Sequence, residues 1–153
     1  RLAGIHLHVI PRTARDGVRL VVNNLTAARW SRSMSRRARA DNTKALVEGV
    51  RRHRIDIITH PGLHVNVDTA ELARACASRG TALEINSYHG SGGPDYVRVA
   101  ARQGVRFVLS SDAHSPAEVG MVEAAARIAR AAGLPPEQII NTAAGGEDGD
   151  GRG

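Results

Sequence analysis

The feature that most constrains the fold is a strict alternation of strand-like and helix-like segments after residue 41. The helical segments carry end signals: Asp68 is placed as an N-cap with Glu71 three residues later, and Gly80, Gly104 and Gly133 each follow a helical pattern. Strands are predicted at 55–60, 81–86 and 105–111, and helices at 41–53 (capped by Asp41 or Asn42), 68–80, 94–104 and 115–133, with a last helical turn at 135–141. Because apolar strands that alternate with helices are buried on both faces, the sequence predicts an α/β domain with parallel strands.

Composition narrows the class of protein. The 153 residues fit one domain, and aromatic residues make up only 3%, so aliphatic and alanine side chains must fill the core. Cys76 is the only cysteine, so an internal disulfide is impossible and a reducing compartment is indicated. No segment resembles a signal peptide or is apolar enough to cross a bilayer, which favours a soluble cytoplasmic protein without membrane partners.

The positive charge gathers in the first third of the chain. Residues 1–54 hold 13 of the 21 Lys and Arg but only 3 of the 15 Asp and Glu. The stretch 29–41, RWSRSMSRRARAD, is the densest part, and residues 9–40 are predicted to be an irregular basic insertion or loop. We interpret the arginine-rich stretch 29–39 as a solvated loop; binding to nucleic acid or another polyanion is the alternative, weakened by the lack of alternating aromatics that could stack on bases.

Histidines and carboxylates stand at the carboxyl end of each predicted strand. LAGIH ends on His6, IDIITH on His60, and VRFVLSSDAH on Asp112 and His114. In a (β/α) barrel these ends meet on one face, where the active site lies. Imidazole and carboxylate together suit zinc, manganese or iron, and several such ligands can hold two or more ions that bind a phosphate and generate a hydroxide.

Each of these residues also has a purely structural interpretation. His60 could bond a loop, and Asp112 could cap the helix that follows it. Only one of Glu84 and Asn86 is expected to face the interior, with Glu84 as a buried structural carboxylate. Further histidines are interpreted as lying outside the site: His8 beyond a strand end, and His53, His64 and His89 at exposed positions.

Taken together, these motifs resemble the C-terminal part of a PHP (polymerase and histidinol phosphatase) domain, most closely its single-domain bacterial phosphatase branch. The resemblance rests on DNTKALVEGVRRHRIDIITHPG, GTALEIN, VRFVLSSDAH and GLPPEQIINT, and covers most of 42–142 plus LAGIH at 2–6. It implies a distorted seven-stranded TIM-like (β/α) barrel, here incomplete, with residues 1–142 as a partial PHP domain and 143–153 as a disordered tail. It also implies a trinuclear metal site, commonly zinc, and phosphoesterase activity.

Carried over residue by residue, the resemblance implies metal-ligating roles for His6, His60, Asp112 and His114. His6 and His60 would share one ion, Asp112 would serve a second and His114 a third, with Asp112 and His114 as the residues closest to catalysis. The family's opening DLHxHT motif, its next histidine and its bridging glutamate are not in this sequence. These departures suggest a truncated chain.

The expected function is hydrolysis of a small phosphate monoester by a metal-activated water. Two alternatives remain open from the sequence. One is a PHP domain of a bacterial X-family DNA polymerase acting on nucleic acid, although HPG stands where HPTGR is expected. The other is an inactive half-barrel that binds polyanions through its basic segment.

Overall fold

The computed structural model describes residues 4–5, 32–63, 65–90 and 93–143. This part of the chain contains a four-stranded sheet in the order β1-β2-β3-β4, with every pair parallel. The strands are β1 (Gly4–Ile5), β2 (Ile57–Ile58), β3 (Ala82–Asn86) and β4 (Phe107–Ser110). The helices are α3 (Arg32–Arg52), α4 (Thr69–Arg79), α5 (Gly93–Ala101) and α6 (Glu123–Ala132), with 3-10 turns η2 (Pro116–Glu118) and η3 (Pro136–Gln138). The predicted α/β alternation with parallel strands is confirmed; closure into a barrel stays a prediction.

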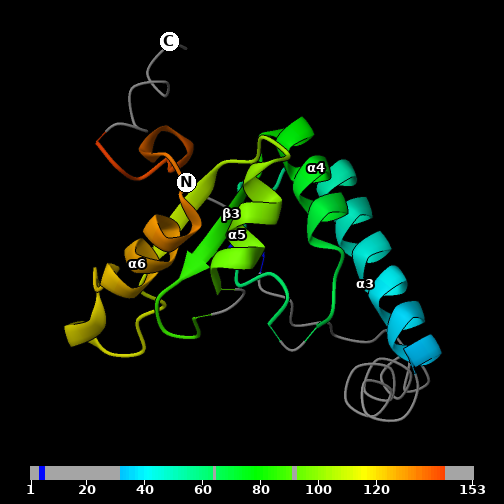
Figure 1. The fold of residues 1–153 in the computed structure, drawn as a ribbon, viewed down its shortest axis with the longest axis horizontal. Helices are drawn as coiled ribbons and strands as arrows, with labels where there is room; N and C mark the ends of the chain where they lie inside the picture. Colours follow the sequence, from blue (N-terminus) through cyan, green and yellow to red (C-terminus); the bar gives the residue numbers. More distant parts are fainter. Residues whose placement is uncertain (1–3, 6–31, 64, 91–92, 144–153) are drawn as a thin grey trace.

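The helices lie side by side in chain order, α3 against α4, α4 against α5 and α5 against α6 (Figure 1). The core between helices and sheet is built from small and aliphatic side chains, as the composition requires. Its fully buried members include Leu72, Cys76, Leu83, Ile85, Val97, Ala100, Val105, Phe107 and Ala125. Within the described residues, no helix is both long and apolar enough to cross a membrane.

Local end signals fix the second helix as predicted. The Asp68 carboxylate accepts a hydrogen bond from the backbone N–H of Glu71, at 3.0 Å, and so caps α4. Gly80 closes the helix in the left-handed conformation, φ 71°, which glycine adopts without a side-chain clash. Strand β3 therefore begins two residues after the Gly80 cap of α4.

The first helix begins nine residues before its predicted cap. Residues 32–40, expected to be irregular, form the first turns of α3, and Asp41 and Asn42 lie inside the helix. Arginine, alanine and methionine are strong helix formers, and Ala38 is buried on the same helix, at 2% exposure. Asn42 donates instead to the backbone carbonyl of Asn66, at 3.1 Å. The predicted loop was wrong over these residues; the rest of it, like the tail after 143, lies outside the described part.

The predicted helix over 115–133 is also wrong as a single element. Ser115 and Glu118 form a capping box that starts η2, but Val119 is extended and Gly120 has φ 84°. This left-handed backbone ends the 3-10 turn, and α6 begins afresh at Glu123. The break leaves Val119 and Met121 exposed in a short connection.

The edge of β4 is closed by a side chain. After η3, the N–H of Ile140 donates to the carbonyl of Phe107, at 2.9 Å, beside a parallel bridge between Phe107 and Ile139. The Asn141 amide then pairs with both backbone groups of Leu109: its Nδ2 donates to the carbonyl, at 2.8 Å, and its Oδ1 accepts from the N–H, at 3.1 Å. One amide side chain thus takes the place of a further strand residue.

Candidate active site

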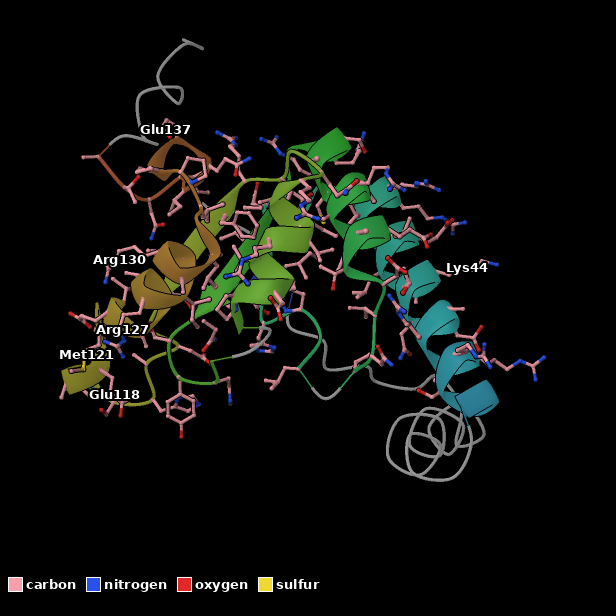
Figure 2. All side chains as sticks on the ribbon, viewed as in Figure 1. Lys44, Glu118, Met121, Arg127, Arg130 and Glu137 are labelled. Atoms are coloured by element: carbon pink, nitrogen blue, oxygen red, sulfur yellow. The ribbon has the colours of Figure 1, made fainter. Side chains whose placement is uncertain are left out.

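The carboxyl ends of three strands, with the loops that follow them, meet at one end of the sheet, which we call this edge below. His60 comes two residues after β2, Asn86 is the last residue of β3, and Asp112 comes two residues after β4. Because the strands are parallel, these carboxyl ends lie together, and the hydrogen bonds described below connect them. Figure 2 shows Glu118 and Met121 at this end, toward which the β3 arrow of Figure 1 points, and Glu137 at the opposite end.

Asp112 is held as a carboxylate by its neighbours. Its Oδ2 accepts a hydrogen bond from the Asn86 amide, at 3.0 Å, and lies 3.3 Å from His89 Nε2. The Asn86 hydrogen bond is the largest cause that lowers the pKa of Asp112 below its ordinary value. Burial opposes it, and the nearby imidazoles of His114, His89 and His60 lower the pKa further. The side chain nevertheless keeps 20% of its surface exposed, so the carboxylate remains reachable from solvent.

The buried side chain of Glu84 connects three residues at the same edge. Its carboxylate accepts hydrogen bonds from the Ser110 hydroxyl, the Asn86 amide and the backbone N–H of His60. The expectation that Glu84 and Asn86 face opposite ways was wrong: the residues are two apart, so the strand places both side chains on one face. Glu84 is buried, at 6% exposure, and ties the ends of β3 and β4 to the loop after β2.

A backbone carbonyl selects the tautomer of His114. Its Nδ1 lies 2.7 Å from the backbone carbonyl of Asp112, which can only accept, so in the neutral ring Nδ1 carries the proton and Nε2 keeps the lone pair. The backbone N–H of His114 donates to the Glu118 carboxylate, at 2.7 Å. An imidazole fixed in this tautomer is suited to bind a metal through Nε2.

Two predicted ligands carry strained backbone. Within the described residues, His60 (φ 26°) and Asp112 (φ 51°) are the non-glycine residues with positive φ. Such conformations cost about 1–3 kcal/mol each and cluster at functional sites, because only a fixed surrounding maintains them. Asp112 is also not a helix cap, since Ser115 occupies that position before η2.

The prediction of a metal site stays a prediction. Of the four predicted ligands, His60, Asp112 and His114 lie at this edge, and His6 lies outside the described part. Imidazole and carboxylate donors fit zinc chemically. However, no group of three or more His, Cys, Asp or Glu in the described ranges is placed to hold an ion. The described residues alone therefore do not fit a complete metal centre.

His89 and Tyr88 were missed in the sequence. His89 is an exposed turn residue, as expected. The sequence did not reveal that it pairs with Asp112 or that its ring lies 5.8 Å from that of His60. Tyr88 contacts both His89, with ring centroids 4.9 Å apart, and His114, at 4.7 Å. The available signal was Asn86 itself, whose Oδ1 accepts from the backbone N–H of His89 and folds this loop back over the strand end.

Comparison with known proteins finds relatives that the chain matches over part of their own length. No family model matches the chain. It is similar to a probable phosphatase of Syntrophotalea carbinolica, with 40% identity over 109 residues, 65% of this chain and 45% of the relative. A probable phosphatase of Edwardsiella ictaluri is 35% identical over 112 residues, 67% of this chain and 46% of the relative. The probable phosphatase YcdX of Escherichia coli O1:K1 is 32% identical over 112 residues, 67% of this chain and 46% of the relative.

Each of these relatives is named a probable phosphatase. The chain spans about half the length of the curated relatives it matches, at 45–46% of each.

Proposed function

We propose that this chain supplies part of the active site of a metal-dependent phosphoesterase of the PHP class, which hydrolyses a small phosphate monoester. The observation that carries the proposal is the convergence of His60, Asp112 and His114 on one edge. There, Asp112 is kept ionised by an amide and three imidazoles. The names of the relatives agree with this chemistry.

Divalent ions, zinc in the first place with manganese or iron as alternatives, would supply the binding of phosphate oxygens and the activation of water. His6, His60, Asp112 and His114 would hold the ions, three in the intact family site, together with ligands outside the described residues. His114 would bind through Nε2, because its Nδ1 is engaged by a carbonyl. Asp112 would bind through its carboxylate, with Asn86 fixing its orientation.

The charge of the site favours this assignment. The Asp112 carboxylate offsets part of a divalent charge, which neutral imidazoles cannot do. Glu84 keeps the His60 loop in its strained conformation by accepting the His60 N–H. A rigid loop limits the ring positions of His60, and preorganised ligands bind an ion more tightly than mobile ones.

Turnover of p-nitrophenyl phosphate under zinc and manganese titration tests the proposal. It should be measured on this chain and on a chain extended at its amino end through the opening motifs that the resemblance implies. We expect metal-dependent hydrolysis by the extended chain, and Asp112→Ala and His114→Ala to reduce it at least 100-fold, a loss of about 2.7 kcal/mol in transition-state stabilisation.

His53→Ala is the matched control, because this exposed histidine follows α3 at the other end of the sheet. It should leave turnover unchanged. Hydrolysis that survives Asp112→Ala, or that chelators do not abolish, would show that this edge is not the active site.

A further inference from the structure

An exposed aromatic side chain lies beside His114. In the described part of the chain, the exposed large hydrophobic residues are Tyr88 (60%), Val99 (39%), Val119 (73%) and Met121 (55%). Among these, Tyr88 contacts the His114 ring directly. Tyr88 therefore places exposed apolar surface next to one histidine of the candidate site.

Tyr88 is unusual among the aromatic residues of this chain. The chain has only two tyrosines, one phenylalanine and one tryptophan, and the described Tyr96 and Phe107 are buried. The Tyr88 ring is held by an edge contact with His89, at an interplanar angle of 89°, and by a tilted contact with His114, at 34°. Two imidazoles thus fix an aromatic ring that still exposes most of its surface beside the proposed phosphate site.

We infer that the exposed Tyr88 ring forms an apolar wall that selects phosphate esters with an aromatic leaving group. The inference rests on the proposed function, because the position of the phosphate defines where the leaving group lies. A flat ring on Tyr88 removes apolar surface from water and gains an offset-stacked or edge contact. An alkyl leaving group of one or two carbons is too short to cover the same surface.

The test is an NMR titration of the zinc-supplemented chain, extended at its amino end as above, with two phosphonates whose carbon–phosphorus bond resists hydrolysis. Benzylphosphonate carries the ring of an aryl phosphate, and ethylphosphonate is its matched probe without a ring. An aromatic contact adds about 0.5–1.5 kcal/mol, so benzylphosphonate should bind about two- to tenfold tighter. Its ring protons should move upfield, and both probes should shift the His114 ring signals.

Tyr88→Ala should bring the ratio of the two dissociation constants to about one and leave that of ethylphosphonate unchanged, which shows that the phosphate site is intact. Tyr88→Phe should retain the ratio. Val99→Ala, an exposed residue on α5, is the control and should change neither constant.

The outcomes separate the inference from the proposed function. If both probes shift the His114 signals with equal affinity, or if Tyr88→Ala preserves the ratio, the apolar wall is refuted and the phosphate site stands. If neither probe shifts these signals, the proposed phosphate site fails and the inference fails with it.

Discussion

Asp112 combines three properties that rarely coincide in a surface residue. Its backbone is left-handed, its carboxylate is bound by the neutral Asn86 amide, and three histidines surround it. The first property costs free energy, and the other two favour the ionised form over the protonated one. A carboxylate arranged in this way stays negative throughout the range in which histidines titrate, as a metal ligand must.

The lowered pKa of Asp112 predicts an acid-sensitive contribution to folding. A carboxyl whose pKa is lower in the folded state stabilises the protein above its ordinary value of 3.8, and this stabilisation is lost as the pH falls through the folded pKa. The free energy of unfolding, measured with urea between pH 7 and pH 3, should therefore fall more steeply for the native chain than for Asp112→Asn. Glu137→Gln, an exposed carboxyl in η3, should keep the native slope. Equal slopes for native chain and Asp112→Asn would contradict the assignment.

At the level of elements, the sequence predicted the helix ends that are set by residues close by in the chain. Asp68 and Gly80 bound α4 as expected, since a cap needs only residues within one turn. The start of α3 and the break at Gly120 were missed: the arginine-rich run carries no stop or start signal, and the left-handed backbone of Gly120 overrides good helix formers. Propensity alone does not locate such boundaries.

In the candidate site, too, local patterns identified some residues, and contacts between distant segments determined the roles of the others. His60, Asp112 and His114 could be picked out because each follows a predicted strand. The roles of Glu84 and His89 could not, because the partners of Glu84 come from β4 and the loop after β2, and His89 meets Asp112 from another loop. Contacts of this kind depend on strand order and register, which local patterns do not contain.

Asn141 provides a prediction for the edge of β4. Asn141→Ala would leave the N–H and carbonyl of Leu109 without their described partners, and each unpaired buried group costs about 1–3 kcal/mol. Part of this cost is recovered by water, so we expect a loss of about 1–2 kcal/mol in the free energy of unfolding, measured by urea denaturation. Gln138→Ala, in the neighbouring η3, is the control and should change it by less than about 0.5 kcal/mol. A native-like stability of Asn141→Ala would show that this amide does not close the edge.

At the scale of the whole molecule, the proposed function implies that the number of ligands limits the activity of this chain. A zinc site normally uses three or four protein ligands, and the described residues place no three together. The family resemblance distributes His6, His60, Asp112 and His114 over three ions, so that each ion would receive at most two ligands from this chain. Two imidazoles, or one carboxylate, compete poorly with water for zinc.

We therefore expect this chain alone to bind zinc weakly and to hydrolyse p-nitrophenyl phosphate slowly. Calorimetric titration with zinc should show an affinity at least 100-fold lower than for the extended chain, because each added ligand contributes binding free energy. Tight binding by the short chain, abolished by Asp112→Ala, would contradict this expectation and place a complete site within residues 1–153.

The amide of Asn141 also determines how the sheet can grow. While the Asn141 side chain occupies the N–H and carbonyl of Leu109, another strand cannot pair with that residue. In the described part of the chain, β1, at the other end of the strand order, is where a further strand can pair without displacing this amide. A strand from elsewhere in a longer chain and a strand from a second molecule would therefore compete for the place beside β1.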